Sequence, residues 1–470
     1  MQKTLQKKNL KNTLKNQVFN KLDGFFYSVN YLLLLGLISV FSFAFNMQMG
    51  GFSIYIIICC YLLVRQRDST PILPLVIYFI TVFRDLSVTS SILFYILLIP
   101  VLVCLIIHFV KFPPIPFCFG KLFLPFFAIS SAMLLGGLLS PHMADWHKGL
   151  LYAIPLGPGL MLIYLFFNNY LRPPEDFDSK KYFCIALVIM GFICSIDILI
   201  YSIHKFTLLT SEFATSHVGW ANTNGVGAIM LVVLPACCYL LVKSKNVFCY
   251  TLMVLTFYLT IFLTKSDGAL GISCVFLPIL IFFVYKKLPK KQRQAFFSLI
   301  CFIAIIGCLT IIALQYNGLL ESYLASIKKS FKSDTGRSKL YRDAIQNFLK
   351  NPIFGVGLGY YNDASLNVAI NPLSRFNFHS TFFTSLACMG SFGVVAYFYY
   401  FYKRYAIITE RNTYFNKFMF IAFSMFECYG FIDVCEFITS PQMITITFLI
   451  LITDLTNIKG NESSLPLIFY

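Results

Sequence analysis

Long runs of apolar residues recur from one end of this 470-residue chain to the other. A run of about 20 such residues, coiled as a helix, matches the thickness of the hydrocarbon core of a bilayer. Hydrophobic residues make up 58% of the chain and charged residues 12%, far more apolar sequence than a soluble core of this size needs. The unbroken runs also exclude the alternating pattern of a membrane β-barrel. We therefore predict an all-α, polytopic helical membrane protein.

About fourteen segments are candidates to cross the membrane, which predicts roughly 12–14 transmembrane helices. The second and third segments are short, so one re-entrant pair is an alternative that leaves the later topology unchanged. The segments lie at residues 26–45, 52–64, 71–83, 90–110, 121–139, 149–167, 182–203, 221–242, 247–264, 268–285, 296–316, 379–402, 415–432 and 440–457.

The basic residues between these segments predict an orientation. If the N-terminus is cytoplasmic, the inside loops carry clusters such as 286–293 and 403–417, and the short outside loops carry one base each. Lys and Arg are retained on the cytoplasmic side of membrane proteins. The net charge of +17 thus reflects orientation, and no nucleic-acid partner is expected. The alternation places the long polar segment that ends at residue 378 outside the cytoplasmic membrane.

The chain is expected to have four parts. Residues 1–25 form a cytoplasmic basic arm at the lipid headgroups, and residues 26–316 form the N-terminal part of the transmembrane bundle. Residues 317–378 form a large extracytoplasmic loop with amphipathic helices, one around 319–327 and one at 338–349, where Pro352 follows. Residues 379–470 complete the bundle.

Basic residues near the large loop are the first candidates for chemistry. His379 stands where the loop enters the next span, and an imidazole there suits a general base or an acceptor-binding group. Its alternative is an interfacial histidine that hydrogen-bonds a loop. Arg337 and Arg342, with Lys339 between them, could hold a diphosphate through bidentate hydrogen bonds. Their alternative is a solvated basic face.

Glycines and outside turns supply further candidates. Gly357 lies between Gly355 and Gly359, where glycine allows tight turns and the close approach of a backbone to a ligand. No βαβ context surrounds these glycines, so they are not a dinucleotide motif. Lys265 lies in a tight hairpin at the membrane edge, where it could join a phosphate site or simply snorkel.

Asn222 and Asn224 enter the span at 221–242. Their amides suit sugar hydroxyls, and asparagine is also a good helix cap. A tryptophan with polar neighbours lies in the outside loop at 142–147, where it could stack on a sugar or simply belong to the interfacial aromatic belt.

Two acidic residues fall inside predicted spans. Asp197 and Glu427 have no basic partner within their own spans. Buried acids in a membrane are expensive and mark ion pathways in many transporters. They are the main support for an alternative of another class, a polysaccharide flippase or ion-coupled transporter.

Four sequence blocks together resemble the O-antigen ligase and Wzy-type polymerase family of bacterial surface polysaccharide synthesis. The pattern is an Asn-rich entry to a span, a hairpin, an Arg-led helix that ends in Pro and spaced glycines, and a His followed by glycines. In order, the blocks are WANTNGVGAIMLVVLPACCYLL (220–241), FLTKSDGALG (262–271), TGRSKLYRDAIQNFLKNPIFGVGLG (335–359) and HSTFFTSLACMGSFGVVAYF (379–398).

This resemblance implies a metal-independent, inverting membrane glycosyltransferase without a cofactor. Its donor would be a glycan on undecaprenyl diphosphate, at the outer face of the bacterial cytoplasmic (inner) membrane. Its acceptor would be another glycan or a lipid core, and membrane lipids would surround it. By matching position, Arg337 would hold the diphosphate leaving group and His379 would assist the acceptor hydroxyl.

The resemblance leaves two activities open. A polymerase would join lipid-linked repeat units into an O-antigen, capsular or exopolysaccharide chain, and a ligase would move a finished glycan to lipid A core or another acceptor. Where the ligases often have arginine after the hairpin serine, this chain has Asp267, and Lys265 would supply the cation. This departure favours the polymerase.

Overall fold

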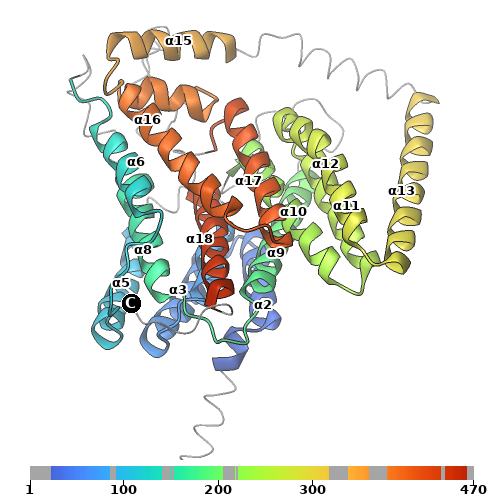
Figure 1. Ribbon diagram of the computed structural model, residues 1–470, viewed down its shortest axis with the longest axis horizontal. Helices are drawn as coiled ribbons and strands as arrows, with labels where there is room; N and C mark the ends of the chain where they lie inside the picture. The colour runs from blue at the N-terminus through green and yellow to red at the C-terminus, as the bar shows by residue number, and fades with distance from the viewer. Residues whose placement is uncertain are drawn as a thin grey trace, which may run out of the picture.

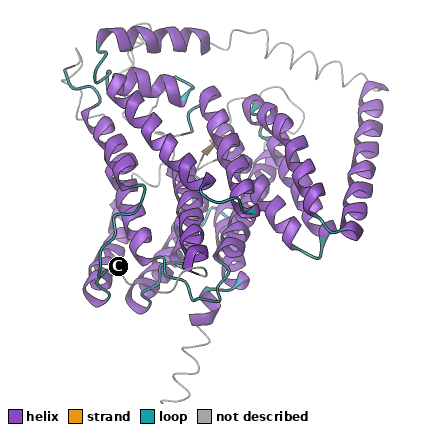
Figure 2. Ribbon diagram, in the orientation of Figure 1, coloured by secondary structure: helices purple, strands orange, loops and turns teal. Residues whose placement is uncertain are grey.

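A computed structural model describes residues 23–84, 92–139, 150, 153–204, 217–218, 221–316, 337–358, 378–435 and 440–462. These residues form a bundle of helices (Figures 1 and 2), which confirms the predicted fold class. The strands in this part of the chain are two residues long each, and they pair antiparallel with His217 opposite Asn222.

The helices fall where the hydrophobic segments predict them. Within the described part of the chain, six helices are long and apolar enough to cross a membrane: α3, α5, α9, α10, α12 and α16. The bounds are α2 Val29–Ala44, α3 Gln48–Arg65, α4 Ile72–Tyr78, η1 Phe79–Val82, α5 Ile92–Lys111, α6 Phe123–Leu135, η4 Pro155–Gly159, α8 Leu160–Tyr170, α9 Ser179–His204, β1 His217–Val218, β2 Ala221–Asn222, α10 Thr223–Lys243, α11 Val247–Leu263, α12 Asp267–Lys287, α13 Lys290–Tyr316, α15 Arg337–Lys350, α16 Thr381–Thr409, α17 Tyr414–Ile432 and α18 Ser440–Glu462.

Helix α10 forms the centre of the bundle. It is apolar on every side and 94% of its spanning window is buried, whereas only 6% of that of α5 is. A helix buried all round needs apolar residues on every face. It also needs small residues where neighbours cross closely. A side chain at Gly227 would place its Cβ 2.9 Å from the Ala269 Cβ of α12, so this glycine sets the approach of α10 and α12.

The glycine-rich segment after α15 docks into a break in α16. At Gly390 the backbone leaves helical geometry (φ 64°, ψ −159°), a conformation open essentially to glycine. The freed backbone groups are satisfied by the docked segment: Ser391 N–H donates to the Pro352 carbonyl (2.8 Å) and Gly357 N–H to the Cys388 carbonyl (2.9 Å). The spaced glycines thus join two stretches of backbone in direct contact.

Glu427 has its basic partner on another helix. Its Oε1 lies 3.1 Å from Nη2 of Arg404 on α16, and its Oε2 accepts a 2.8 Å hydrogen bond from the Tyr397 hydroxyl. Both charged side chains are almost wholly buried, at 1% and 6% exposure. The predicted span at 379–402 is too short, because α16 continues to Thr409 and encloses Arg404. Glu427 therefore acts as an internal tie between α16 and α17.

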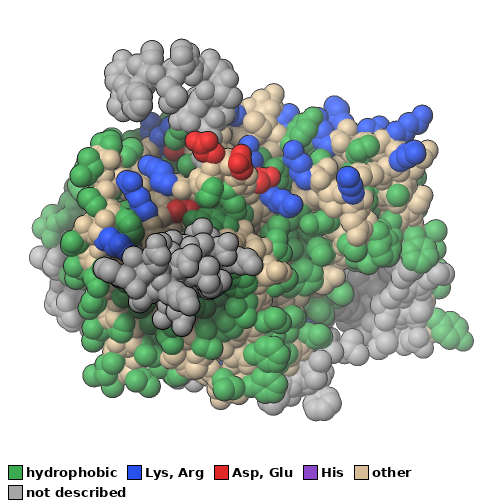
Figure 3. Space-filling model, turned by 90° about the horizontal axis from the view of Figure 1, so that it is seen from below, with side chains coloured by type: hydrophobic (Ala, Val, Ile, Leu, Met, Phe, Trp, Pro, Cys, Tyr) green, Lys and Arg blue, Asp and Glu red, His purple; other side chains and the backbone are tan. Residues whose placement is uncertain are grey.

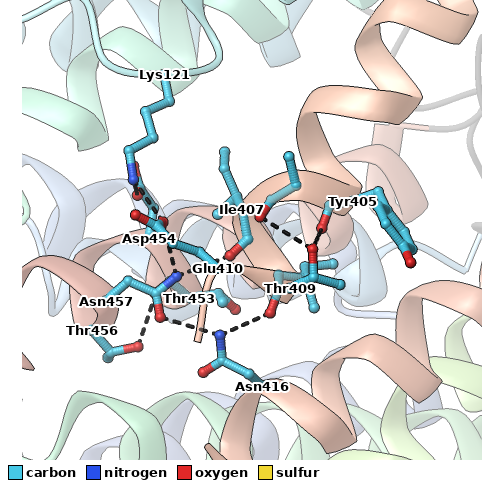
Figure 4. Close-up of polar contacts among 12 residues, drawn as sticks. Lys121, Tyr405, Ile407, Thr409, Glu410, Asn416, Thr453, Asp454, Thr456 and Asn457 are labelled. Carbon is cyan, nitrogen blue, oxygen red and sulfur yellow. Dashed lines mark hydrogen bonds and ion pairs between the residues drawn. The ribbon is translucent and has the colours of Figure 1, made fainter. Parts of the chain in front are cut away.

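A second polar network joins the ends of α16, α17 and α18 (Figure 4). Lys121 places its Nζ 2.7 Å from both Glu410 and Asp454. Asn457 donates to the Ile407 carbonyl (2.9 Å), and Asn416 donates to the Asn457 side-chain oxygen (3.1 Å). Asp454, Asn416 and Asn457 are buried, and buried polar groups that satisfy one another in this way fix the register of the helices they join.

Candidate active site

Asp433 is the centre of a polar cluster at one end of the bundle, where α17 ends and α10 and α16 begin. Its Oδ1 lies 3.1 Å from His379 Nδ1 and accepts a 2.7 Å hydrogen bond from the Val434 N–H. Its Oδ2 accepts a 2.8 Å bond from Asn224 Nδ2. A carboxylate oxygen accepts hydrogen bonds, so the histidine tautomer that fits carries its proton on Nδ1, and three N–H groups then converge on Asp433.

With its proton on Nδ1, the His379 ring has its other nitrogen available as an acceptor. A Nδ1–H that donates to a carboxylate leaves the lone pair of the imidazole on Nε2. Asp433 is 8% exposed, whereas 40% of the His379 side chain is accessible, so a substrate can approach the ring. The backbone of His379 is left-handed (φ 46°). Such strain in a residue other than glycine concentrates at functional sites.

Helix α15 lies across the start of α16 (Figure 1) and reaches the same cluster. The Tyr341 ring stacks on Phe383 of α16, with centroids 4.3 Å apart, and its hydroxyl donates to the His379 carbonyl (3.3 Å). Burial raises the pKa of the Tyr341 phenol, the Arg337 charge opposes that rise and Asp433 adds to it. Arg337 and Asp433 therefore both lie within electrostatic reach of one side chain.

The basic residues of α15 do not share one face. Arg337 is half-buried and, four residues before Tyr341, lies on the same side of the helix. Lys339 and Arg342 are exposed, and Arg342 Nε donates to the Ser338 carbonyl of its own helix (3.4 Å). The helix thus directs Arg337 toward α16, and Lys339 and Arg342 away from it.

The hairpin between α11 and α12 joins the cluster through Ser266. The Ser266 side chain caps α12, and its hydroxyl oxygen lies 2.9 Å from the Tyr429 hydroxyl. Tyr429 in turn lies within electrostatic reach of Asp433 and Arg337. Lys265 precedes this serine in a left-handed conformation (φ 52°). Desolvation lowers the pKa of its ammonium, as expected for a half-buried cation near the site.

Residues 251–398 match the model of the O-antigen ligase family. The ligase-family match confirms the predicted resemblance and supports a membrane enzyme of polysaccharide biosynthesis, glycosyltransferase-like in type. It implies a lipid-linked glycan donor and an acceptor, and a multi-pass membrane protein. No curated protein matches the chain.

The matched segment, residues 251–398, contains part of the polar cluster around Asp433. It includes the Lys265 hairpin, Arg337 on α15 and His379 at the start of α16. Asn224 and Asp433 lie outside it. The fold therefore completes the site with α10 and with the end of α17.

The remaining predicted residues stay predictions as binding groups. Gly357 is buried and its N–H is bonded to Cys388, so its visible role is backbone packing. The side chain of Asn222, the loop residues 140–149 and the helix predicted around 319–327 lie outside the described residues.

Sequence reasoning missed Asp433 and Tyr341. Asp433 directly follows the span at 415–432, and an acid at that boundary was the available signal. Tyr341 lies within the amphipathic helix predicted at 338–349, where the periodicity counts it as an apolar residue and gives no signal for its hydroxyl.

Proposed function

We propose that this protein polymerises lipid-linked oligosaccharide repeat units into a cell-surface polysaccharide, at the outer face of the bacterial inner membrane. The observation that supports this most is the Asp433–His379 pair, with Arg337 held on the neighbouring helix. One group can accept a proton while the other can stabilise a phosphate, which a glycosyl transfer from a diphosphate carrier requires.

The reaction is a single displacement at the anomeric carbon of the donor. The acceptor hydroxyl oxygen forms the new glycosidic bond, and its proton passes to Nε2 of His379. The bond from the anomeric carbon to the diphosphate oxygen breaks, and its electron pair leaves with undecaprenyl diphosphate. Attack opposite the leaving group inverts the anomeric configuration. Asp433 stabilises the imidazolium that forms, as a buried carboxylate does beside a catalytic histidine.

The leaving group gains negative charge in this step, so cations fixed near it lower the barrier. Arg337 supplies a guanidinium that stays charged and can bind two phosphate oxygens. Lys265 supplies a second cation from the hairpin, where Asp267 takes the place of the arginine found in ligases. With these residues the mechanism needs no metal ion. Addition of a chelator is expected to leave the rate unchanged, and strong inhibition would contradict this part of the proposal.

Reconstitution distinguishes the possible activities. The full chain in proteoliposomes is given a repeat unit on undecaprenyl diphosphate, and the products are separated by size. A ladder of increasing length supports the polymerase. A single transfer to an added lipid-core acceptor identifies a ligase, and movement of the lipid without a new bond identifies a flippase. Either of the last two results overturns the proposal.

A further inference from the structure

A cavity of about 360 Å³ opens at the end of the bundle opposite to His379 and Asp433. It is lined by Lys180, Tyr239, Lys243, Asn412, Thr413, Tyr414 and Phe415. Helix α17 runs from Tyr414 in this cavity to Asp433 in the candidate active site, and α10 runs from Asn224 to Lys243. At 1.5 Å per residue, helices of this length separate the two sites by about 30 Å.

Positive charge gathers at this cavity. The positive charges of Lys243 and Arg411 lie close enough to the Lys180 ammonium to repel it. Lys287 places its Nζ 4.3 Å from the centre of the Tyr414 ring and 3.3 Å from its hydroxyl. Asp178 offsets the charge in part, but its Oδ1 also accepts the Lys181 N–H at the start of α9. Figure 3 shows Lys and Arg side chains spread over this face of the molecule.

The other lining groups suit an anion with a polar head. Lys180 and Phe415 lie in the first turns of α9 and α17, and N-terminal helix dipoles add to the attraction for negative charge. Thr413 and Asn412 add polar side chains from the loop between α16 and α17. The Lys180 Nζ is 5.8 Å from the centre of the Phe415 ring, so the cation is held at the apolar wall. The volume falls at the small end of ligand pockets.

We propose that this cavity is a binding site for a phosphate group, carried by an anionic phospholipid headgroup or by a soluble phosphate. Lysines bind phosphate as point charges, and basic pockets between membrane helices bind phosphorylated headgroups. This site differs from a basic surface without a pocket, because two lysines, a hydroxyl and an amide line the same open pocket. The site is independent of the proposed glycosyl transfer.

The test compares two double variants of the full chain in detergent at 0.15 M salt. Lys180→Gln with Lys243→Gln removes both lining cations. Lys181→Gln with Lys245→Gln removes two exposed lysines nearby that do not line the cavity. Calorimetric titration uses sodium pyrophosphate in one arm and dioctanoyl phosphatidylglycerol in the other, with dioctanoyl phosphatidylcholine as the lipid without net charge.

We expect saturable binding in at least one arm. Binding of the phosphatidylglycerol alone identifies a lipid site, and binding of pyrophosphate identifies a soluble ligand. At about 1 kcal/mol for each lysine, the cavity variant loses roughly 30-fold in affinity and the control variant less than about twofold. Equal losses in the two variants, or no saturable binding in either arm, overturn the proposal. If the double variant unfolds, Lys243→Gln alone gives the same test, since Lys243 is exposed.

Discussion

Asp433→Asn tests how the carboxylate orients His379. In the wild type, Oδ1 accepts from His379 and Val434 and Oδ2 accepts from Asn224. An amide has one acceptor and one donor end, so it cannot satisfy all three donors. Loss of one hydrogen bond to a charged group costs about 1.5–3 kcal/mol. At about 1.4 kcal/mol per factor of ten, the rate of transfer falls roughly 10- to 150-fold.

The assay is the initial rate of glycan transfer by purified protein in proteoliposomes, with kcat and KM for the donor measured separately. We expect kcat to fall and KM to stay, because Asp433 acts through the histidine and not on the diphosphate. In the double variant Asp433→Asn with Asn224→Asp, the new amide can donate to the new carboxylate. Its rate of transfer should be about tenfold higher than that of Asp433→Asn alone. A rate within about threefold of wild type for Asp433→Asn, at unchanged thermal stability, would refute the orientation role.

Three other predictions concern backbone strain, a half-buried cation and a buried ion pair. Gly390→Ala places a Cβ 2.5 Å from the Ile353 carbonyl carbon, at a residue whose φ is 64°. We expect this variant to lower the free energy of unfolding by about 3 kcal/mol or more, measured by thermal unfolding. Gly271 has open space around it, so the control variant Gly271→Ala should be neutral or stabilising. Lys265→Asn keeps a residue that tolerates left-handed backbone and removes a half-buried cation. Folding lowers the pKa of Lys265, so the unfolded chain binds the proton more tightly and the charge opposes folding at every pH below the unfolded pKa. The variant should therefore have a higher melting temperature and a higher KM for the donor. A loss of stability with an unchanged KM would contradict this prediction. Glu427→Gln leaves Arg404 buried without its counter-charge and should lower the free energy of unfolding by about 3–5 kcal/mol. Adding Arg404→Met to the same chain should restore part of this loss. An unchanged melting temperature for Glu427→Gln would contradict a stabilising role for the ion pair.

The positions of the helices were predictable because apolar runs directly report burial in lipid. The end of α15 was also predictable, since Pro352 follows it. The extent of α16 was not: Arg404 resembles a loop residue in sequence, and only Glu427 on another helix makes its burial acceptable. Periodicity within one span cannot identify a partner from a different span.

The candidate site was predictable only in part. His379 and Arg337 stand in segments with recognisable patterns, and the fold brings both to the same end of the bundle. Asp433 carries no local pattern, because its role arises where three helices meet. The glycines of residues 355–357 were assigned a possible ligand contact, whereas their backbone groups bond the broken turn of α16. Such backbone pairing depends on the non-helical Gly390, which lies in the middle of an apolar run.

The central claim is that Arg337 holds the leaving group while the equally charged Arg342 on the same helix does not. The most direct measurement is the rate of undecaprenyl diphosphate release by the reconstituted variants Arg337→Ala and Arg342→Ala. Loss of a cation that stabilises the transition state predicts a fall of at least about 100-fold for Arg337→Ala. Arg342 is exposed, so Arg342→Ala should stay within about twofold of wild type. Equal losses in both variants, or full activity in Arg337→Ala, would contradict the assignment.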